Sequence, residues 1–238
     1  MAKGLLIGGG AFVVLIVAIV VVTVVLVSSA TSARPSPEPF VEKYLSAVSR
    51  GDASAARAID DRTVPKGAGV DAATFRSDAV LSGATERISD VRIEDSKVFG
   101  RDSGRVTASY TLSGDRQNLI VNVKWDDAAG GWALADGVFH AVEVAGGTSS
   151  VDDSVPFFLA GEPSSDPIAI SRGRISYLAY PGVYPFELGV SPDLLSDPDT
   201  VPFELRVTPA PDQDADTVYV QFDREPVAAD LITTPKNG

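Results

Sequence analysis

The 238-residue chain contains no cysteine, one methionine and one histidine. The lack of cysteine excludes disulfide scaffolds, thiol nucleophiles, zinc fingers and iron–sulfur clusters, and a single histidine leaves little for a metal site. Positive charge is also scarce, since 20 Lys and Arg stand against 32 Asp and Glu, which gives a formal net charge of −12. Because no basic block is present to neutralise phosphates, nucleic acid is not an expected partner.

The motifs of several enzyme classes are missing as well. The chain has no GxSxG elbow, no SxxK, no HExxH and no strand-linked phosphate-binding loop. Asp212, Asp214 and Asp216 have the spacing of the first calcium ligands in an EF-hand loop. Thr217, however, stands where that loop needs glycine. The sequence therefore predicts a noncatalytic protein with no catalytic residues, no metal site and no cofactor.

What the chain does have is a long apolar run near its N-terminus. Leu5 to Val27 make 23 residues without charge, and only Thr23 carries a polar side chain. A helix of that length reaches about 35 Å, enough to cross a hydrocarbon core of roughly 30 Å. A signal peptide cleaved after Ala30 or Ala33 is the alternative, although the run exceeds the usual signal core of roughly 7 to 15 residues. We predict a single-pass anchor in the cell membrane, with residues 1–4 cytoplasmic and the C-terminal domains extracytoplasmic.

Composition divides the rest of the chain into two parts. Residues 28–37 are rich in small residues and proline, and we expect them to form a linker. Beyond residue 145, 15 acidic residues face only 5 basic ones, whereas the preceding part is nearly balanced. This change coincides with a run of glycine, threonine and serine at 146–150. The sequence therefore predicts one domain at 38–145, a linker at 146–150 and a second domain at 151–238.

The first part begins with a helical pattern and ends with strands. Apolar residues recur at the spacing of one helix face, at Val41, Tyr44, Leu45 and Val48. Gly51 is expected to end this helix, and Asp52 and Asp71 to cap two more. Apolar and polar residues then alternate at 106–112 and at 119–125, which is typical of half-buried strands. Helices followed by such strands predict an α+β domain, with helices packed on a curved antiparallel sheet.

The second part is predicted to be almost entirely strand. Short runs rich in Val, Ile, Phe and Tyr are separated by Pro and Gly, at residues 155–159, 168–170, 175–180, 183–190, 203–207 and 218–222. Short strands at this density, about six in roughly 90 residues, are typical of a β-sandwich. The predicted fold class is thus a transmembrane helix, an α+β domain and an all-β sandwich.

Two segments of the first part resemble a known family. Residues 39–59 (PFVEKYLSAVSRGDASAARAI) and 122–137 (NVKWDDAAGGWALADG) resemble the nuclear transport factor 2-like cone fold, and most closely its membrane-anchored extracytoplasmic versions in Gram-positive cell envelopes. The resemblance implies a cone-fold domain in a superfamily in which some members are enzymes that use Asp or His, while many are noncatalytic. In the second part, residues 176–188 (SYLAYPGVYPFEL) resemble the Pro-Gly-x-Tyr turn of PEGA-like and carboxypeptidase regulatory-like sandwich modules.

His140 is the one histidine through which such chemistry would act. It shares the face of its predicted strand with Val138 and Val142, so the preferred interpretation is a core histidine. The alternative is a cone-fold enzyme or small-ligand carrier with a pocket around His140, which Tyr110 and Trp125 would line. The function expected from the sequence is noncatalytic binding or scaffolding in the cell envelope, with an envelope protein or a cell-wall component as partner.

Overall fold

The computed structural model describes residues 34–66, 70–147, 154–155, 157–164, 168–169, 176–196, 198–209, 216–221 and 235. Residues 37–238 belong to one compact unit. Within the described residues, no helix combines the length and the apolar character that a membrane crossing requires. The predicted span Leu5–Val27 and the cleavage sites at Ala30 and Ala33 lie outside the described residues.

The described helices are short, and local sequence explains where each begins and ends. They are α2 (Glu38–Arg50), α3 (Ala53–Asp60), α4 (Asp78–Ser82) and the 3-10 turns η1 (Asp61–Thr63), η2 (Pro192–Leu194) and η3 (Pro198–Thr200). Helix α2 ends at Gly51, whose φ of 81° is left-handed and therefore favours glycine. Asp52 caps α3 by accepting a hydrogen bond from the backbone N–H of Ala55 at 2.9 Å. Both signals are confirmed as the sequence predicted them.

The third predicted helix begins later than expected. Ser77, not Asp71, caps α4, and its hydroxyl accepts a hydrogen bond from the backbone N–H of Val80. Asp71 instead closes a turn, because its carboxylate accepts hydrogen bonds from the backbone N–H groups of Ala73 and Thr74. An aspartate serves either purpose with the same geometry, so its type alone does not separate a turn from a cap.

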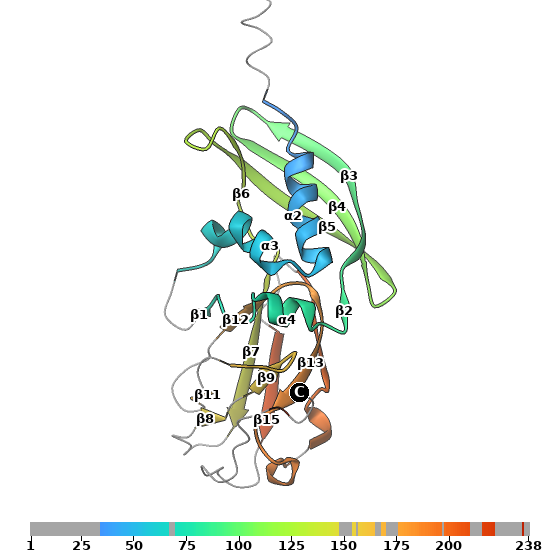
Figure 1. Ribbon diagram of the computed structural model, residues 1–238, viewed down its shortest axis with the longest axis vertical. Helices are drawn as coiled ribbons and strands as arrows, with labels where there is room; N and C mark the ends of the chain where they lie inside the picture. The colour runs from blue at the N-terminus through green and yellow to red at the C-terminus, as the bar shows by residue number, and fades with distance from the viewer. Residues whose placement is uncertain are drawn as a thin grey trace, which may run out of the picture. The chain divides into compact units, whose positions relative to one another are not determined.

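A four-stranded antiparallel meander follows these helices. It consists of β3 (Ser89–Phe99), β4 (Ser103–Leu112), β5 (Asp115–Asp126) and β6 (Gly131–Leu134), paired in chain order. Helix α2 lies over this sheet (Figure 1), and its buried face joins the apolar side chains of β4 and β5 in one core. The alternation at 106–112 and 119–125 is confirmed, and β5 and β6 set Trp125 opposite Trp132.

The remaining strands pair across long stretches of sequence. One sheet has the order β1 (Val70–Asp71), β12 (Ser176–Ala179), β7 (His140–Gly147) and β15 (Asp216–Gln221). A second sheet has the order β10 (Glu162–Pro163), β9 (Phe157–Leu159), β13 (Gly182–Leu188) and β14 (Glu204–Val207), with β2 (Glu86–Arg87) also on β13. A separate small pair joins β8 (Ser154–Val155) and β11 (Ile168–Ala169). Strands from both sides of the predicted linker at 146–150 therefore share two sheets.

Strands β12 and β13, on either side of the Pro-Gly-x-Tyr segment at Pro181 and Gly182, do not pair with each other as a hairpin. Strand β12 pairs with β7, whereas β13 pairs with β9, β14 and β2, so the chain passes from one sheet to the other at this point. Gly182 is needed for a different reason, since a Cβ there would lie 3.0 Å from the carbonyl oxygen of Glu86 and 3.1 Å from the ring of Tyr184. A side chain at residue 182 would require these neighbours to shift by a few tenths of an ångström, so glycine favours the close approach of β2 to β13.

The predicted fold class is wrong. The described chain is mostly β-sheet with few short helices, rather than an α+β cone-fold domain of helices on a sheet followed by a separate all-β sandwich, and the predicted transmembrane helix lies outside the described residues. The β-rich character of the C-terminal part is the portion that agrees. Hydrophobic periodicity identified most strands correctly, but it carries no information on which strands pair, and here β1 pairs with β12 through residues more than a hundred positions apart.

Asp78 links α4 to the start of α3, and this contact predicts a pH dependence. Its carboxylate accepts hydrogen bonds from the hydroxyl and the backbone N–H of Ser54, which lower the pKa of Asp78. A lowered pKa contributes stability above the ordinary carboxyl value of about 3.9, and this contribution is lost as the pH falls through the folded-state value. We therefore expect Asp78→Asn to melt slightly below the parent at pH 7 and together with it near pH 2.5. A melting difference that persists at pH 2.5 would contradict this origin.

Candidate functional site

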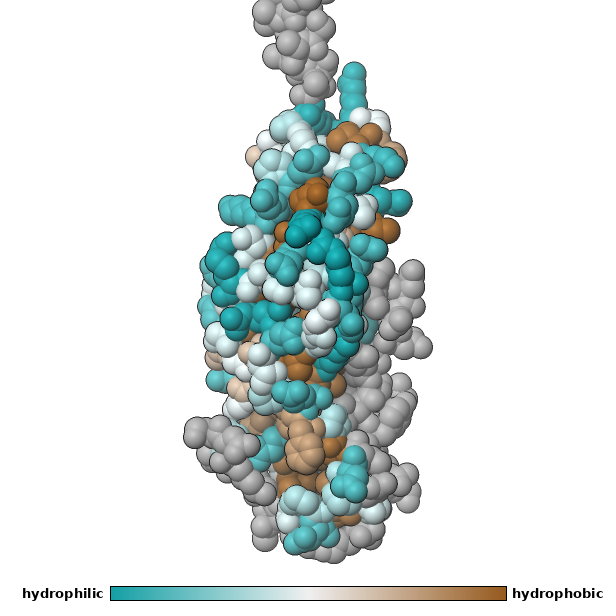
Figure 2. Space-filling view, turned by 90° about the vertical axis from the view of Figure 1, so that its right-hand side faces the viewer, coloured by the Kyte–Doolittle hydropathy of each residue, from teal (hydrophilic) through white to brown (hydrophobic). Residues whose placement is uncertain are grey.

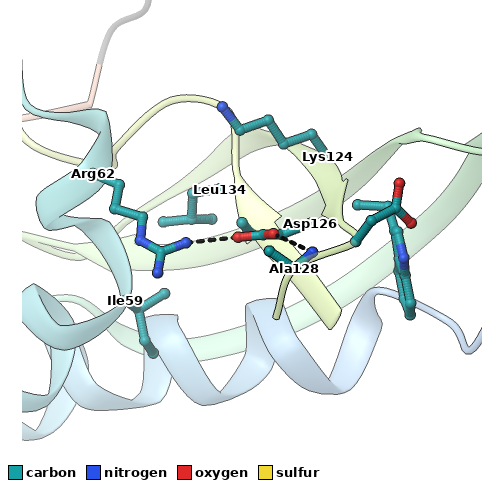
Figure 3. Close-up of a pocket in the computed structure, with 9 residues that line it drawn as sticks. Ile59, Arg62, Lys124, Asp126, Ala128 and Leu134 are labelled. Atoms are coloured by element: carbon teal, nitrogen blue, oxygen red, sulfur yellow. Dashed lines mark hydrogen bonds and ion pairs between the residues drawn. The ribbon is translucent and has the colours of Figure 1, made fainter. Parts of the chain in front are cut away.

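A pocket of about 460 Å³ opens beside the end of β5. Residues from α3, η1, β5, β6 and the β5–β6 turn line it: Ile59, Arg62, Lys124, Trp125, Asp126, Asp127, Ala128, Ala133 and Leu134. Figure 3 shows the guanidinium of Arg62 directed at the carboxylate of Asp126. The volume falls within the range of small-molecule sites, roughly 300 to 1,000 Å³.

The turn that borders the pocket is fixed by Asp126. Its carboxylate accepts hydrogen bonds from the backbone N–H groups of Ala128 at 2.9 Å and of Ala129 at 3.1 Å. Arg62 donates a further hydrogen bond to it at 2.6 Å. The backbone N–H of Ala129 and the guanidinium of Arg62 hold the pKa of Asp126 below its usual range. Asp126 is therefore charged at neutral pH and is occupied in holding the turn.

Two tryptophans form the aromatic side of this region. The rings of Trp125 and Trp132 meet edge to face, with centroids 5.3 Å apart and planes at 89°. Trp132 is buried in the core, whereas Trp125 is half-buried and lines the pocket. The pocket thus combines an aromatic and aliphatic wall with charged groups. Its lining, all of it within the described residues, contains no serine, threonine, tyrosine or histidine.

The structure brings only one of the three predicted site residues to this pocket. Trp125 lines it, and His140 and Tyr110 do not. Tyr110 lies buried on the inner face of β4, where its hydroxyl donates a hydrogen bond to Gln117 at 2.7 Å and burial raises its pKa to about 12. His140 is buried at the start of β7, opposite Ala179 of β12. No single site therefore unites the three side chains.

A second group of polar side chains is sealed inside the unit. The carboxylate of Asp60 forms an ion pair with Arg76, and both side chains are essentially inaccessible to solvent, at 0% and 1% exposure. The hydroxyl of Tyr44 donates to Asp60 at 2.7 Å, and that of Tyr180 donates at 3.1 Å. The backbone N–H of Val138 in turn donates to the hydroxyl of Tyr44 at 3.0 Å. We call Tyr44, Asp60, Arg76 and Tyr180 the buried polar cluster.

The buried polar cluster connects segments that are far apart in the sequence. The guanidinium of Arg76 lies 4.7 Å above the ring of Phe139, and its Nη1 donates to the carbonyl oxygen of Ala72. Burial raises the pKa of the hydroxyls of Tyr44 and Tyr180, so both remain protonated hydrogen-bond donors. Because Asp60 and Arg76 are closed to solvent, a substrate has no access to their charges, and we assign the cluster a structural role.

Sequence reasoning missed most of these residues, and the reason differs for each group. Asp126 carried a detectable signal, since an aspartate two residues before small residues in a turn is typical of a side-chain-to-backbone turn. Arg62 and Lys124 had none, because exposed basic residues are common. Arg76 follows the buried Phe75 in a segment that the sequence assigned to a helix, and nothing local indicates that an arginine there is buried with an aspartate 16 positions earlier.

The described residues also hold no group of three or more potential metal ligands. Asp212 and Asp214, from the calcium-like spacing, lie outside them. In comparisons with known proteins, no family model, no curated protein and no solved structure matches the chain. The resemblance to membrane-anchored envelope proteins stays a prediction, and function is inferred from the side chains alone.

Proposed function

We propose that the chain is a noncatalytic binding or scaffolding protein of the cell envelope, anchored in the membrane by Leu5–Val27 with the compact unit on the extracytoplasmic side. The observation that carries the binding role is the pocket at Trp125, which presents an aromatic wall and charged side chains at the surface. The apolar run of 23 uncharged residues supports the anchor. The partner is then an envelope protein or a cell-wall component that reaches this pocket.

The distribution of polar groups favours binding over catalysis. The buried polar cluster holds Asp60 and Arg76, whose charges are closed to solvent. In the pocket, Asp126 and Arg62 are engaged with each other, and Asp126 also with the backbone of its own turn. Asp60 is therefore out of a substrate's reach and Asp126 is already engaged, so neither is free to act as an acid or base. The alternative is an enzyme or carrier centred on His140, and the substitution of His140 described below tests it.

The anchor is tested by fractionating cells that produce the full chain. We expect the protein to stay with the membrane fraction through alkaline carbonate and to require detergent for release, because an uncharged helix of this length is stable only in the bilayer. External protease should digest the compact unit in intact spheroplasts. A mature protein that begins at Thr31 or Arg34 would show cleavage after Ala30 or Ala33 and would overturn the anchor.

The binding role is tested by two substitutions in the cell. We expect His140→Gln to preserve the phenotype that the gene supports and Trp125→Ala to abolish it, provided that both variants are folded and reach the membrane in normal amounts. A catalytic His140 would instead lower activity by a factor of about 10² or more when replaced. Loss of the phenotype in folded His140→Gln, with Trp125→Ala unaffected, would favour the enzyme or carrier.

A further inference from the structure

The pocket holds one cationic group that the rest of the described chain leaves unpaired. The ammonium group of Lys124 has no ion-pair or hydrogen-bond partner among the described residues, whereas Lys97 on β3 pairs with Asp95 at 3.1 Å. Lys124 lines the pocket, and its ammonium end turns toward the side that carries Arg62 (Figure 3). Because Lys124 lines the pocket, its charge favours an anionic ligand there over a neutral one.

Arg62 adds to this positive end of the pocket. Its side chain is 77% exposed, and its ion pair with Asp126 uses Nη1. A guanidinium carries five N–H donors, so most of them remain for a ligand. Asp126 competes little for these donors, because it is held by Arg62 and two backbone N–H groups.

The pocket also has an apolar lining. Ile59, Ala133 and Leu134 line it together with Trp125. Carbon atoms of a ligand placed there would be removed from water, which favours binding in proportion to the apolar area covered. On the face that Figure 2 shows, apolar residues lie in patches among hydrophilic ones.

From this lining we propose that the pocket binds a small organic carboxylate, whose charged group pairs with Lys124 and Arg62 and whose apolar body packs against Trp125 and Ile59. This rests on the binding role proposed above and names the class of ligand that the role would serve. Neither group of residues alone would make the pocket selective for a carboxylate. The apolar residues would bind acids and neutral compounds equally well, and exposed cations alone attract any anion weakly and in a salt-sensitive way.

The chain carries its own reporter for this test. Trp125 and Trp132 are the only two tryptophans, so intrinsic fluorescence observes the pocket region alone. The full chain in phosphatidylcholine nanodiscs would be titrated with 3-phenylpropionate and, as the neutral analogue of equal shape, with 3-phenylpropionamide. We expect a saturable fluorescence change with the carboxylate, weakened by raising the salt from 0.05 to 0.5 M, and at least tenfold weaker binding of the amide.

Two variants distinguish binding in the pocket from nonspecific attraction of the carboxylate to surface lysines. Lys124→Gln removes the unpaired cation and should weaken 3-phenylpropionate binding about tenfold or more while leaving amide binding unchanged. Lys97→Gln removes an exposed lysine outside the pocket and should bind both compounds as the parent does. Equal binding of acid and amide, or an unaffected Lys124→Gln, would overturn the carboxylate assignment, as would the absence of saturation with either compound. The cell phenotype of Trp125→Ala reports on the proposed function independently of these titrations.

Discussion

Replacing Arg76 by methionine is expected to lower the free energy of unfolding by about 3 to 5 kcal/mol. Methionine keeps much of the apolar stem but leaves the carboxylate of Asp60 buried without its cation. The hydroxyls of Tyr44 and Tyr180 still donate to Asp60, but they carry no charge to balance it. Because total stabilities of domains are roughly 5 to 15 kcal/mol, this loss removes a large fraction, and urea denaturation would show it as a lower midpoint.

Arg57 provides the matched control for this result. It pairs with Asp61 at 3.6 Å and is 38% exposed, so Arg57→Met should cost no more than about 1 kcal/mol. Combining Arg76→Met with Asp60→Asn removes the isolated charge and should recover part of the loss. If Arg76→Met is no more costly than Arg57→Met, the buried polar cluster does not stabilise the fold in the way its geometry indicates.

Local features of the fold were predictable because their causes lie within a few residues. The end of α2 at Gly51 and the cap of α3 at Asp52 depend on one residue each, and the alternation of β4 and β5 follows from burial of one face. The pairing of β2 with β13 depends on contacts between residues about a hundred positions apart. No local pattern encodes such a contact, and the predicted fold class failed at this level.

The candidate site was predictable only in its aromatic part. Tryptophan on a strand signals either core or binding surface, and Trp125 proves to line the pocket while Trp132 lies in the core. His140 and Tyr110 are residue types that often bind ligands. Their side chains, on β7 and β4, are buried instead. Lys124 is a candidate because its ammonium group has no partner among the described residues. That depends on the positions of all neighbouring side chains, so no sequence pattern predicts it.

Replacing Phe157 by alanine is the second change with a large expected effect, about 3 to 5 kcal/mol. Phe157 is fully buried, and its ring contacts those of Phe75, Tyr177 and Phe186, with centroids 5.1 to 5.8 Å apart. Phe75 precedes the predicted linker at 146–150, and the other rings follow it. The cluster therefore joins both predicted domains through one set of contacts, and losing its central ring leaves a cavity that close-packed neighbours fill only in part.

The same variant tests whether the two predicted domains unfold separately, because the two tryptophans at 125 and 132 both precede the linker. If the core is shared, Phe157→Ala will shift the unfolding midpoint equally by tryptophan fluorescence and by far-ultraviolet circular dichroism. Phe157→Leu should cost less, since it retains part of the buried volume, and Phe203→Ala, at a side chain 90% exposed, should cost almost nothing. A circular dichroism transition that moves while the fluorescence transition stays in place would instead show that residues 38–145 and 151–238 fold independently.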